Sequence, residues 1–228
     1  MSGSEALQVY GMVLSSMPIG ENDKRVVILT RELGRISAFA RGARRPGSQL
    51  MAATGAMAFG KFSLVAGRSA YVLVQAQIDQ YFLELAQDPE AIWYAYYFLD
   101  FADYYGREGI DATDMLNLLY LSLRALQHDS LDNRLIRRIY ELRLMVINGE
   151  YAPQMNSLSE STLYTVQYIC RSPLEKLYSF AVNPEILEEL EHMLDRHMDR
   201  MMDRPLKSRK VLDEMISGQK AVERKDTE

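Results

Sequence analysis

A cluster of positive side chains near the N-terminus is the strongest chemical signal in the sequence. The stretch from position 24 to 45 contains one acid, Glu32, and the following seven cations: Lys24, Arg25, Arg31, Arg35, Arg41, Arg44 and Arg45. Its last part, Arg-Gly-Ala-Arg-Arg, places small residues beside guanidinium groups. Glycine and alanine let a backbone come close to a phosphate, and arginine can hold two phosphate oxygens at once. The stretch therefore predicts a surface that binds phosphate backbones without reading bases.

Charge is distributed unevenly along the chain. Residues 1–80 contain nine Lys/Arg and five Asp/Glu, a balance of +4, and the remaining residues contain 17 and 26, a balance of −9. Together these give the net charge of −5. Parts of opposite sign indicate that the first part meets a polyanion and the second does not.

Residues that could build a catalytic or metal site are few and poorly spaced. The chain has one cysteine, Cys170, and two of its three histidines, His192 and His197, stand five positions apart on a predicted helix. That spacing points the two rings in different directions, because a helix turns through about 100° per residue. The sequence also lacks a glycine-rich phosphate loop, a nucleophile elbow and a zinc-protease motif. We therefore predict no enzymatic activity, no metal and no cofactor.

The elements that must position the cations are predicted to be strands. Short β-branched or alternating runs separated by turns occur at residues 7–14, 26–30, 36–41, 62–65 and 71–75. Five such strands with a basic face suit a small barrel of the OB type, and an SH3-like barrel suits the pattern almost as well. Single-stranded DNA could stack on aromatic side chains of this region, for which the candidates are Tyr10, Phe39, Phe59, Phe62 and Tyr71.

After residue 80 the apolar spacing becomes helical. Asp88-Pro89 and Asn183-Pro184 each place a capping side chain before a proline, which is typical of a helix start. We predict an α+β protein with a five-stranded barrel of the OB or SH3-like type at residues 1–80, packed on an all-helical domain at 81–217, and a frayed tail at 218–228. No apolar run is long enough to span a membrane, and no secretory signal is visible, so we expect no membrane partner and a cytoplasmic location.

Three segments in order make the chain similar to a known family. They are the run from Glu32 to Arg45, the run Tyr140-Glu-Leu-Arg-Leu144, and the run Arg204-Pro-Leu-Lys-Ser-Arg209. On these segments the chain resembles RecO, the bacterial recombination mediator of the RecF pathway. The resemblance runs from about Val9 to Met215.

The resemblance implies a function in DNA repair. It implies an OB-fold barrel before a helical domain, binding of single- and double-stranded DNA, annealing of complementary strands, action with RecR, and a location at the nucleoid. It further implies help in loading recombinase onto DNA coated by single-stranded DNA-binding protein, whose acidic C-terminal tail is a partner. The DNA-contact role carries over to Arg35, Arg41, Arg44 and Arg45, with Lys24, Arg25 and Arg31 as neighbours.

Two further expectations come from the same resemblance. Arg137 and Arg138 match a basic pair implied to bind the carboxylates of the partner's tail. Many family members carry a four-cysteine zinc module after the segment that corresponds to Gly149–Pro153, but here that segment runs directly into residues 154–159 without cysteine. We therefore expect the zinc module to be absent.

Two other functions compete with a recombination mediator. One is a protein-interaction adaptor whose barrel has little affinity for DNA, which would suit the acidic isoelectric point of about 5.4. The other is an enzyme that works in a cleft between barrel and helices, for which the sequence offers no acid–base or nucleophile set.

Overall fold

The computed structural model describes the chain except residues 1–5, 129, 152–157 and 226–228. Clustering of contacts divides it into two units. We call Met1–Leu83 together with Ala102–Tyr120 the barrel unit, and Glu84–Phe101 together with Leu121–Glu228 the helical unit. The segment at 102–120 therefore belongs with the strands, which the sequence did not indicate.

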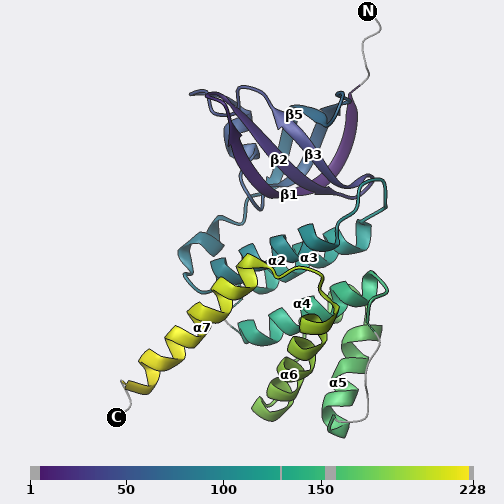
Figure 1. Cartoon of the computed structure of the whole chain (residues 1–228), viewed down its shortest axis with the longest axis vertical. Coiled ribbons are helices and arrows are strands. Elements are labelled where there is room, and N and C mark those ends of the chain that lie inside the picture. The colour runs from purple at the N-terminus through teal and green to yellow at the C-terminus, as the bar shows by residue number, and fades with distance from the viewer. Residues whose placement is uncertain (1–5, 129, 152–157, 226–228) are drawn as a thin grey trace, which may run out of the picture. The chain divides into compact units, whose positions relative to one another are not determined.

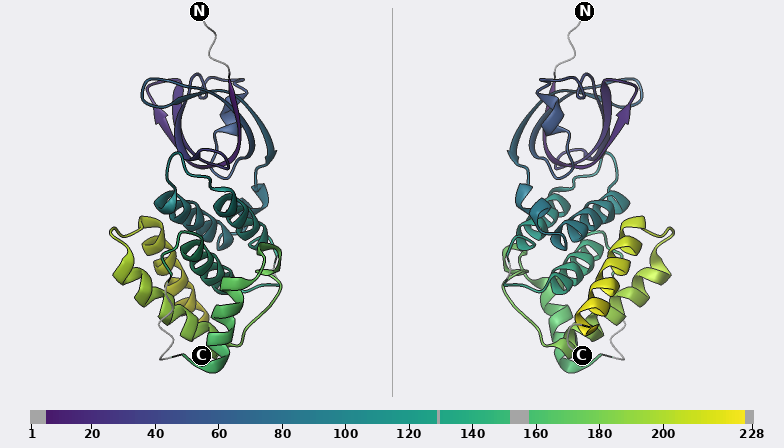
Figure 2. Two further views of the ribbon diagram at one scale, coloured as in Figure 1. Left: turned by 90° about the vertical axis from the view of Figure 1, so that its right-hand side faces the viewer. Right: turned by 90° about the vertical axis from the view of Figure 1, so that its left-hand side faces the viewer.

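The barrel unit is built on five strands that close on themselves (Figures 1 and 2). The strands are β1 (Leu7–Ile19), β2 (Asp23–Thr30), β3 (Gly34–Ala40), β4 (Phe59–Val65) and β5 (Tyr71–Gln80). Their order around the barrel is β1-β2-β3-β5-β4, and a short helix, α1 (Leu50–Ala53), lies between β3 and β4 in the chain. The predicted OB barrel is confirmed in preference to the SH3-like alternative.

Alternation of side chains explains why these segments form a barrel. Along β3 every second residue is buried, so Ile36, Ala38 and Ala40 face the interior while Arg35, Ser37 and Phe39 face outward. The interior contains Val, Ile, Leu and Phe side chains from all five strands. Irregularities in register, such as the one between Val13 and Ser15 in β1, bend the strands enough for the sheet to close.

The segment at 102–120 joins the barrel unit through backbone hydrogen bonds. Arg35 donates its amide to the carbonyl of Arg107 at 3.0 Å, and Gly109 donates to the carbonyl of Leu33 at 2.9 Å. Gly34, with φ +65°, allows this approach, because a Cβ at this position would lie 2.1 Å from the carbonyl oxygen of Arg107. A glycine is therefore required at the first residue of β3, where the segment at 102–120 approaches the strand.

The helical unit contains most of the remaining elements, and two helices, α2 and α3, contribute residues to both units. The helices are α2 (Ala91–Tyr105), α3 (Thr113–Ala125), α4 (Asn133–Ile147), α5 (Glu160–Arg171), α6 (Pro184–Met201) and α7 (Lys207–Lys225), with short 3-10 turns at Leu83–Gln87 and Leu174–Lys176. The predicted cap is present at α6, where Asn183 accepts from the amide of Ile186 at 2.9 Å. Helix α7 continues to Lys225, into the segment that the sequence analysis expects to be a tail. None of the described helices is long and apolar enough to cross a membrane.

Candidate nucleic-acid interface

The backbone of the Arg41–Arg45 turn, at the exit of β3, is held by hydrogen bonds to Asn22 and Asp23 and to residues in or next to the turn. Gly42 donates its amide to the carboxylate of Asp23 at 2.8 Å, and Arg44 donates its amide to the carbonyl of Asn22 at 2.9 Å. The amides of Ala43 and Arg45 are bonded within the turn. The backbone amides at these four positions are therefore already occupied and are not available to a phosphate. The guanidinium groups, not the backbone, are what this turn offers a ligand.

Ala43 fixes the turn to the barrel. Its side chain is fully buried and belongs to the barrel core. Gly42 has φ +67°, a left-handed conformation that lets the chain reverse directly after the strand. Gly42 and Ala43 thus shape the turn and anchor it, while the side chains of Arg41, Arg44 and Arg45 are exposed. The turn therefore presents three neighbouring positive side chains from a backbone that is anchored to the barrel core.

The strand pairing separates the seven predicted cations into two groups. Lys24 and Arg25 pair with Ala40 and Phe39, so they lie at the same end of the β2–β3 hairpin as the turn. Arg31 and Arg35 lie at the other end, because Thr30 pairs with Gly34. At about 3.3 Å per residue, Lys24 and Arg31 are separated by roughly 20 Å. The single continuous positive face that the sequence suggested is therefore split along the strands.

Arg31 and Arg35, at the end of the hairpin away from the turn, already contact other side chains. Arg35 forms an ion pair with Asp103 at 2.6 Å, and its side chain is 34% exposed. The guanidinium of Arg31 lies 5.2 Å from the centre of the Tyr10 ring. These contacts tie β2 and β3 to other parts of the barrel unit.

Near the turn, Arg25 is the strand cation that faces outward. It is exposed, and its Nε donates to the hydroxyl of Ser37 on β3 at 2.8 Å. Lys24 points the other way, and its Nζ donates to the hydroxyl of Thr54, beside α1, at 3.1 Å. Lys24 therefore helps to close the end of the barrel rather than to extend the outer face.

Arg68 is a further cation that the sequence analysis missed. It is exposed in the β4–β5 loop, three residues before Tyr71, which pairs with Ala38 of β3. Three residues span at most about 11 Å, so Arg68 lies within that distance of the residue paired with Ala38, on the side of the pairing that leads toward the start of β3. The hairpin signal around Arg68 was visible in the sequence, but the pairing of β5 with β3 was not.

The structure distinguishes among the aromatic candidates for base stacking. Phe62 is fully buried in the barrel core, so its candidacy is wrong. Tyr10 and Phe59 contact each other, with ring centres 5.0 Å apart, and Phe59 also packs on Tyr120. Tyr71 packs against the barrel core. Phe39 is the candidate that is half-buried on the outer face of β3, next to Arg25.

Arg137 and Arg138 lie in the interior of the helical unit. Their side chains are 3% and 5% exposed, and both donate to the fully buried carboxylate of Glu141 at 2.8 Å. Arg137 also pairs with Asp213, and Arg138 with Asp195. A partner's carboxylate would have to displace these ion pairs to reach either arginine. The pair therefore supports the packing of α4 against α6 and α7 rather than forming an accessible docking site.

The buried carboxylate at the centre of this network is strongly perturbed. Burial alone would raise the pKa of Glu141, but attraction by Arg138 and Arg137 and hydrogen bonds from Tyr97 and Arg137 lower it to about 2. Glu141 is therefore ionised at neutral pH and compensates two buried positive charges.

The described residues contain no cluster of three or more His, Cys, Asp or Glu side chains that could hold a metal ion. Residues 152–157, where the resemblance places the missing zinc module, are among those the structure does not describe.

Comparison with known proteins identifies the family. Residues 1–82 match the family model described as recombination protein O N terminal, and residues 86–157 and 152–210 match the one described as recombination protein O C terminal. The chain belongs to the RecO family. Both halves of the family pattern are present in order, and the first coincides with the strands that carry the arginine turn.

Relatives in this family are similar over nearly their whole length. The chain is 27% identical to the DNA repair protein RecO of Acetivibrio thermocellus, over 84% of this chain and 90% of that protein. It is 26% identical to the RecO of Alkaliphilus metalliredigens, over 87% and 94% of the two chains, and 27% identical to that of Exiguobacterium sibiricum, over 91% and 96%. The chain is thus a RecO-family DNA repair protein.

Proposed function

We propose that the protein is a non-enzymatic recombination mediator that binds single- and double-stranded DNA through the end of its barrel. In this proposal it anneals complementary strands and, together with RecR, helps to load recombinase onto DNA coated by single-stranded DNA-binding protein. It does so in the cytoplasm, at the nucleoid.

One observation supports the DNA-binding part above the others. Exposed arginines from two segments, Arg25 and the Arg41–Arg45 turn, lie at the same end of the β2–β3 hairpin, and a further exposed arginine, Arg68, lies in the loop before the strand that pairs with β3. Two acids lie close in sequence to Arg25. Asp23 accepts a hydrogen bond from the amide of Gly42, and Glu21 is exposed to solvent. Strands 2 and 3 of OB barrels, with the loops around them, are the usual binding surface for oligonucleotides.

The first prediction concerns the turn. In the variant R41A/R44A/R45A, we expect single-stranded DNA affinity and strand annealing to fall, because up to three phosphate contacts are lost. Fluorescence-anisotropy titrations at several salt concentrations measure the effect. The slope of log K against log salt should become shallower by about 2, at about 0.7 per phosphate contact on single strands. The melting temperature should stay within a few degrees, because all three side chains are exposed.

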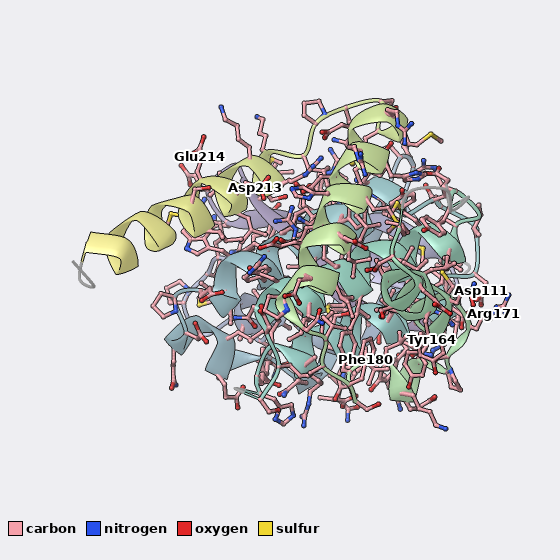
Figure 3. The ribbon with its side chains drawn as sticks, turned by 90° about the horizontal axis from the view of Figure 1, so that it is seen from below. Asp111, Tyr164, Arg171, Phe180, Asp213 and Glu214 are labelled. Atoms are coloured by element: carbon pink, nitrogen blue, oxygen red, sulfur yellow. The ribbon has the colours of Figure 1, made fainter. Side chains whose placement is uncertain are left out.

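A matched control removes the same charge elsewhere. Arg124, Arg171 and Lys176 are exposed on the helical unit, and Figure 3 labels Arg171. The variant R124A/R171A/K176A should keep the native affinity and salt slope. If the native protein binds no DNA even at low salt, or if the two triple variants behave alike, the proposed interface is wrong.

A second candidate function is that of a protein-interaction adaptor with little DNA affinity. A groove of about 700 Å³ in the helical unit favours it, lined by Tyr164 and Thr165 of α5, by Phe180 and by Ile186 of α6 (Figure 3). Tyr164 is 70% exposed there. An adaptor would bind partner proteins with native affinity while failing the DNA titration above, which separates the two functions.

A further inference from the structure

Three outward-facing residues form one row across the first three strands. In the pairing of β1 with β2, Met17 is opposite Arg25, and in the pairing of β2 with β3, Arg25 is opposite Phe39. Directly paired residues project from the same face of a sheet, with Cβ atoms about 5 Å apart. We call Met17, Arg25 and Phe39 the mixed row, since it alternates apolar, cationic and aromatic side chains.

The mixed row faces away from the barrel core. The neighbouring pair Ser16–Val26 faces inward, because Val26 belongs to the core, so Met17 and Arg25 point outward. Met17 is 62% exposed and Ile19, two residues further along the same face, is 38% exposed. The end of β1 thus presents apolar side chains to solvent beside Arg25.

An exposed methionine alone has no functional meaning, since scattered apolar residues are normal on protein surfaces. Here, however, the apolar side chains are framed by charge. Arg25 is within the row, the Arg41–Arg45 turn begins two residues after Phe39, and Arg68 stands three residues before Tyr71, which pairs with Ala38 of β3. A ligand suited to this surface combines apolar flat faces with negative charge at short intervals. Unpaired nucleotides have both properties, because each base exposes a π-face and each link carries a phosphate.

We propose that the mixed row contacts unpaired bases and makes this end of the barrel selective for single-stranded over double-stranded DNA. The inference rests on the proposed DNA-binding function and adds the residues that determine strand selectivity. Phe39 stacks on a base, and the flexible, polarisable side chain of Met17 packs against a neighbouring one. Arg25, held by Ser37, and the arginines of the turn take the adjoining phosphates.

Duplex DNA cannot use the row in this way. Its bases are stacked on one another, and its surface presents sugar and phosphate to a flat protein face. Met17 and Phe39 would then lie against charged groups and gain nothing, while the arginines would bind the duplex as before. The row should therefore contribute to single-strand affinity and leave duplex affinity unchanged.

The test compares binding of the full chain to a fluorescent oligothymidylate and to a duplex of equal length, at one fixed salt concentration. In the variant Phe39→Leu, we expect single-strand affinity to fall about fivefold or more, since aromatic stacking contributes about 1–3 kcal/mol per base. In the variant Met17→Ser, we expect a smaller fall, because a thioether packs on a base without stacking. Duplex affinity and the salt slope should stay at native values. The control is Leu7→Ser, which removes an exposed apolar side chain from the opposite end of the same strand and should change neither affinity.

A second measurement does not depend on a loss of binding. In the variant Phe39→Trp, the new indole should be quenched by the oligothymidylate and not by saturating duplex, after subtraction of the native Trp93 signal. If the native protein binds DNA but the row variants keep the native ratio of single-strand to duplex affinity, or the indole responds equally to both, the mixed row is not the selectivity determinant and the proposed function survives. If the native protein binds neither DNA, both proposals fail.

Discussion

At the scale of single residues, the same residue type has opposite uses in the two units. The arginines of the Arg41–Arg45 turn are exposed and form no ion pair with the acids that the structure describes, which suits them to a mobile anionic ligand. Arg137 and Arg138 are buried and compensated by Glu141, Asp195 and Asp213. Removing one charge from a buried set leaves the others without a partner in a medium that solvates charge poorly.

We predict that Glu141→Gln destabilises the protein by about 3–5 kcal/mol at neutral pH, because two buried guanidiniums lose their shared counter-charge. Urea unfolding measures the change. Glu214→Gln, at an exposed position of α7 labelled in Figure 3, should cost less than about 0.5 kcal/mol. Equal effects of the two changes would contradict a structural role for the buried network.

The same carboxylate predicts an acid-dependent stability. The pKa of Glu141 lies at about 2 in the folded protein, below its ordinary value of 4.5, so the folded state favours the ionised form. Its contribution to stability is complete above about pH 4.5 and is lost as the pH falls toward 2. The Glu141→Gln variant should lack this part of the pH dependence when unfolding is measured between pH 5 and pH 3.

Residue positions were predictable from the sequence only where neighbours in the chain decide them. The exposure of Arg41, Arg44 and Arg45 follows from their place beyond a strand. The amides of Gly42 and Arg44, by contrast, bond to Asp23 and Asn22, which lie at the start of β2 and just before it. The burial of Arg137 and Arg138 depends on acids of α6 and α7, more than fifty positions away. No local pattern contains that information.

At the scale of elements, the closing of the barrel depends on contacts of different range. The β1–β2 and β2–β3 pairings join neighbouring segments, and alternation in the sequence was enough to predict their strands. The parallel pairing of β5 with β3 involves Ala38–Tyr71 and Phe39–Val72 and brings together segments far apart in the chain. Because the sequence did not reveal that contact, it could not show that the loop containing Arg68 leads into a strand paired with β3.

The attachment of the 102–120 segment to β3 gives a prediction for this scale. We expect Gly34→Ala to destabilise the protein by more than about 2 kcal/mol, since it adds a left-handed strain of about 1–2 kcal/mol to a collision with the carbonyl of Arg107. Gly109→Ala is the control, because its φ is +78° but nothing lies within 4 Å of the added Cβ. Similar shifts of the urea midpoint for both variants would show that the close approach is unimportant.

At the scale of the whole molecule, charge and fold divide the chain in a consistent way. The positive balance falls on the strands, and the negative balance falls on the helices. The fold class itself was predicted from the change in apolar spacing near residue 80, and that change coincides with the change in charge. The spacing did not predict that residues 102–120, which follow a helical pattern, would belong to the barrel unit.

This division predicts where DNA will protect the backbone. With a saturating single-stranded oligonucleotide, amide hydrogen exchange should slow in residues 15–27, 37–48 and 66–72. It should stay unchanged in 133–147 and 184–201, because Arg137 and Arg138 are held in buried ion pairs and acids outnumber cations in the second of these helices. Mass spectrometry of peptic fragments measures the pattern. Protection confined to the helices would place the DNA on the wrong unit for our proposal.

The firmness of the Arg41–Arg45 turn also has a consequence for the speed of binding. Since four of its amides are already bonded and Ala43 is anchored in the core, the backbone of the turn needs little further ordering when DNA arrives, and the cost is confined to the arginine side chains. The association rate is then limited by diffusion in the field of the exposed arginines, which attracts the polyanion from a distance and weakens as salt is added. We therefore expect a patch built in this way to capture DNA quickly at low salt and more slowly as salt is added.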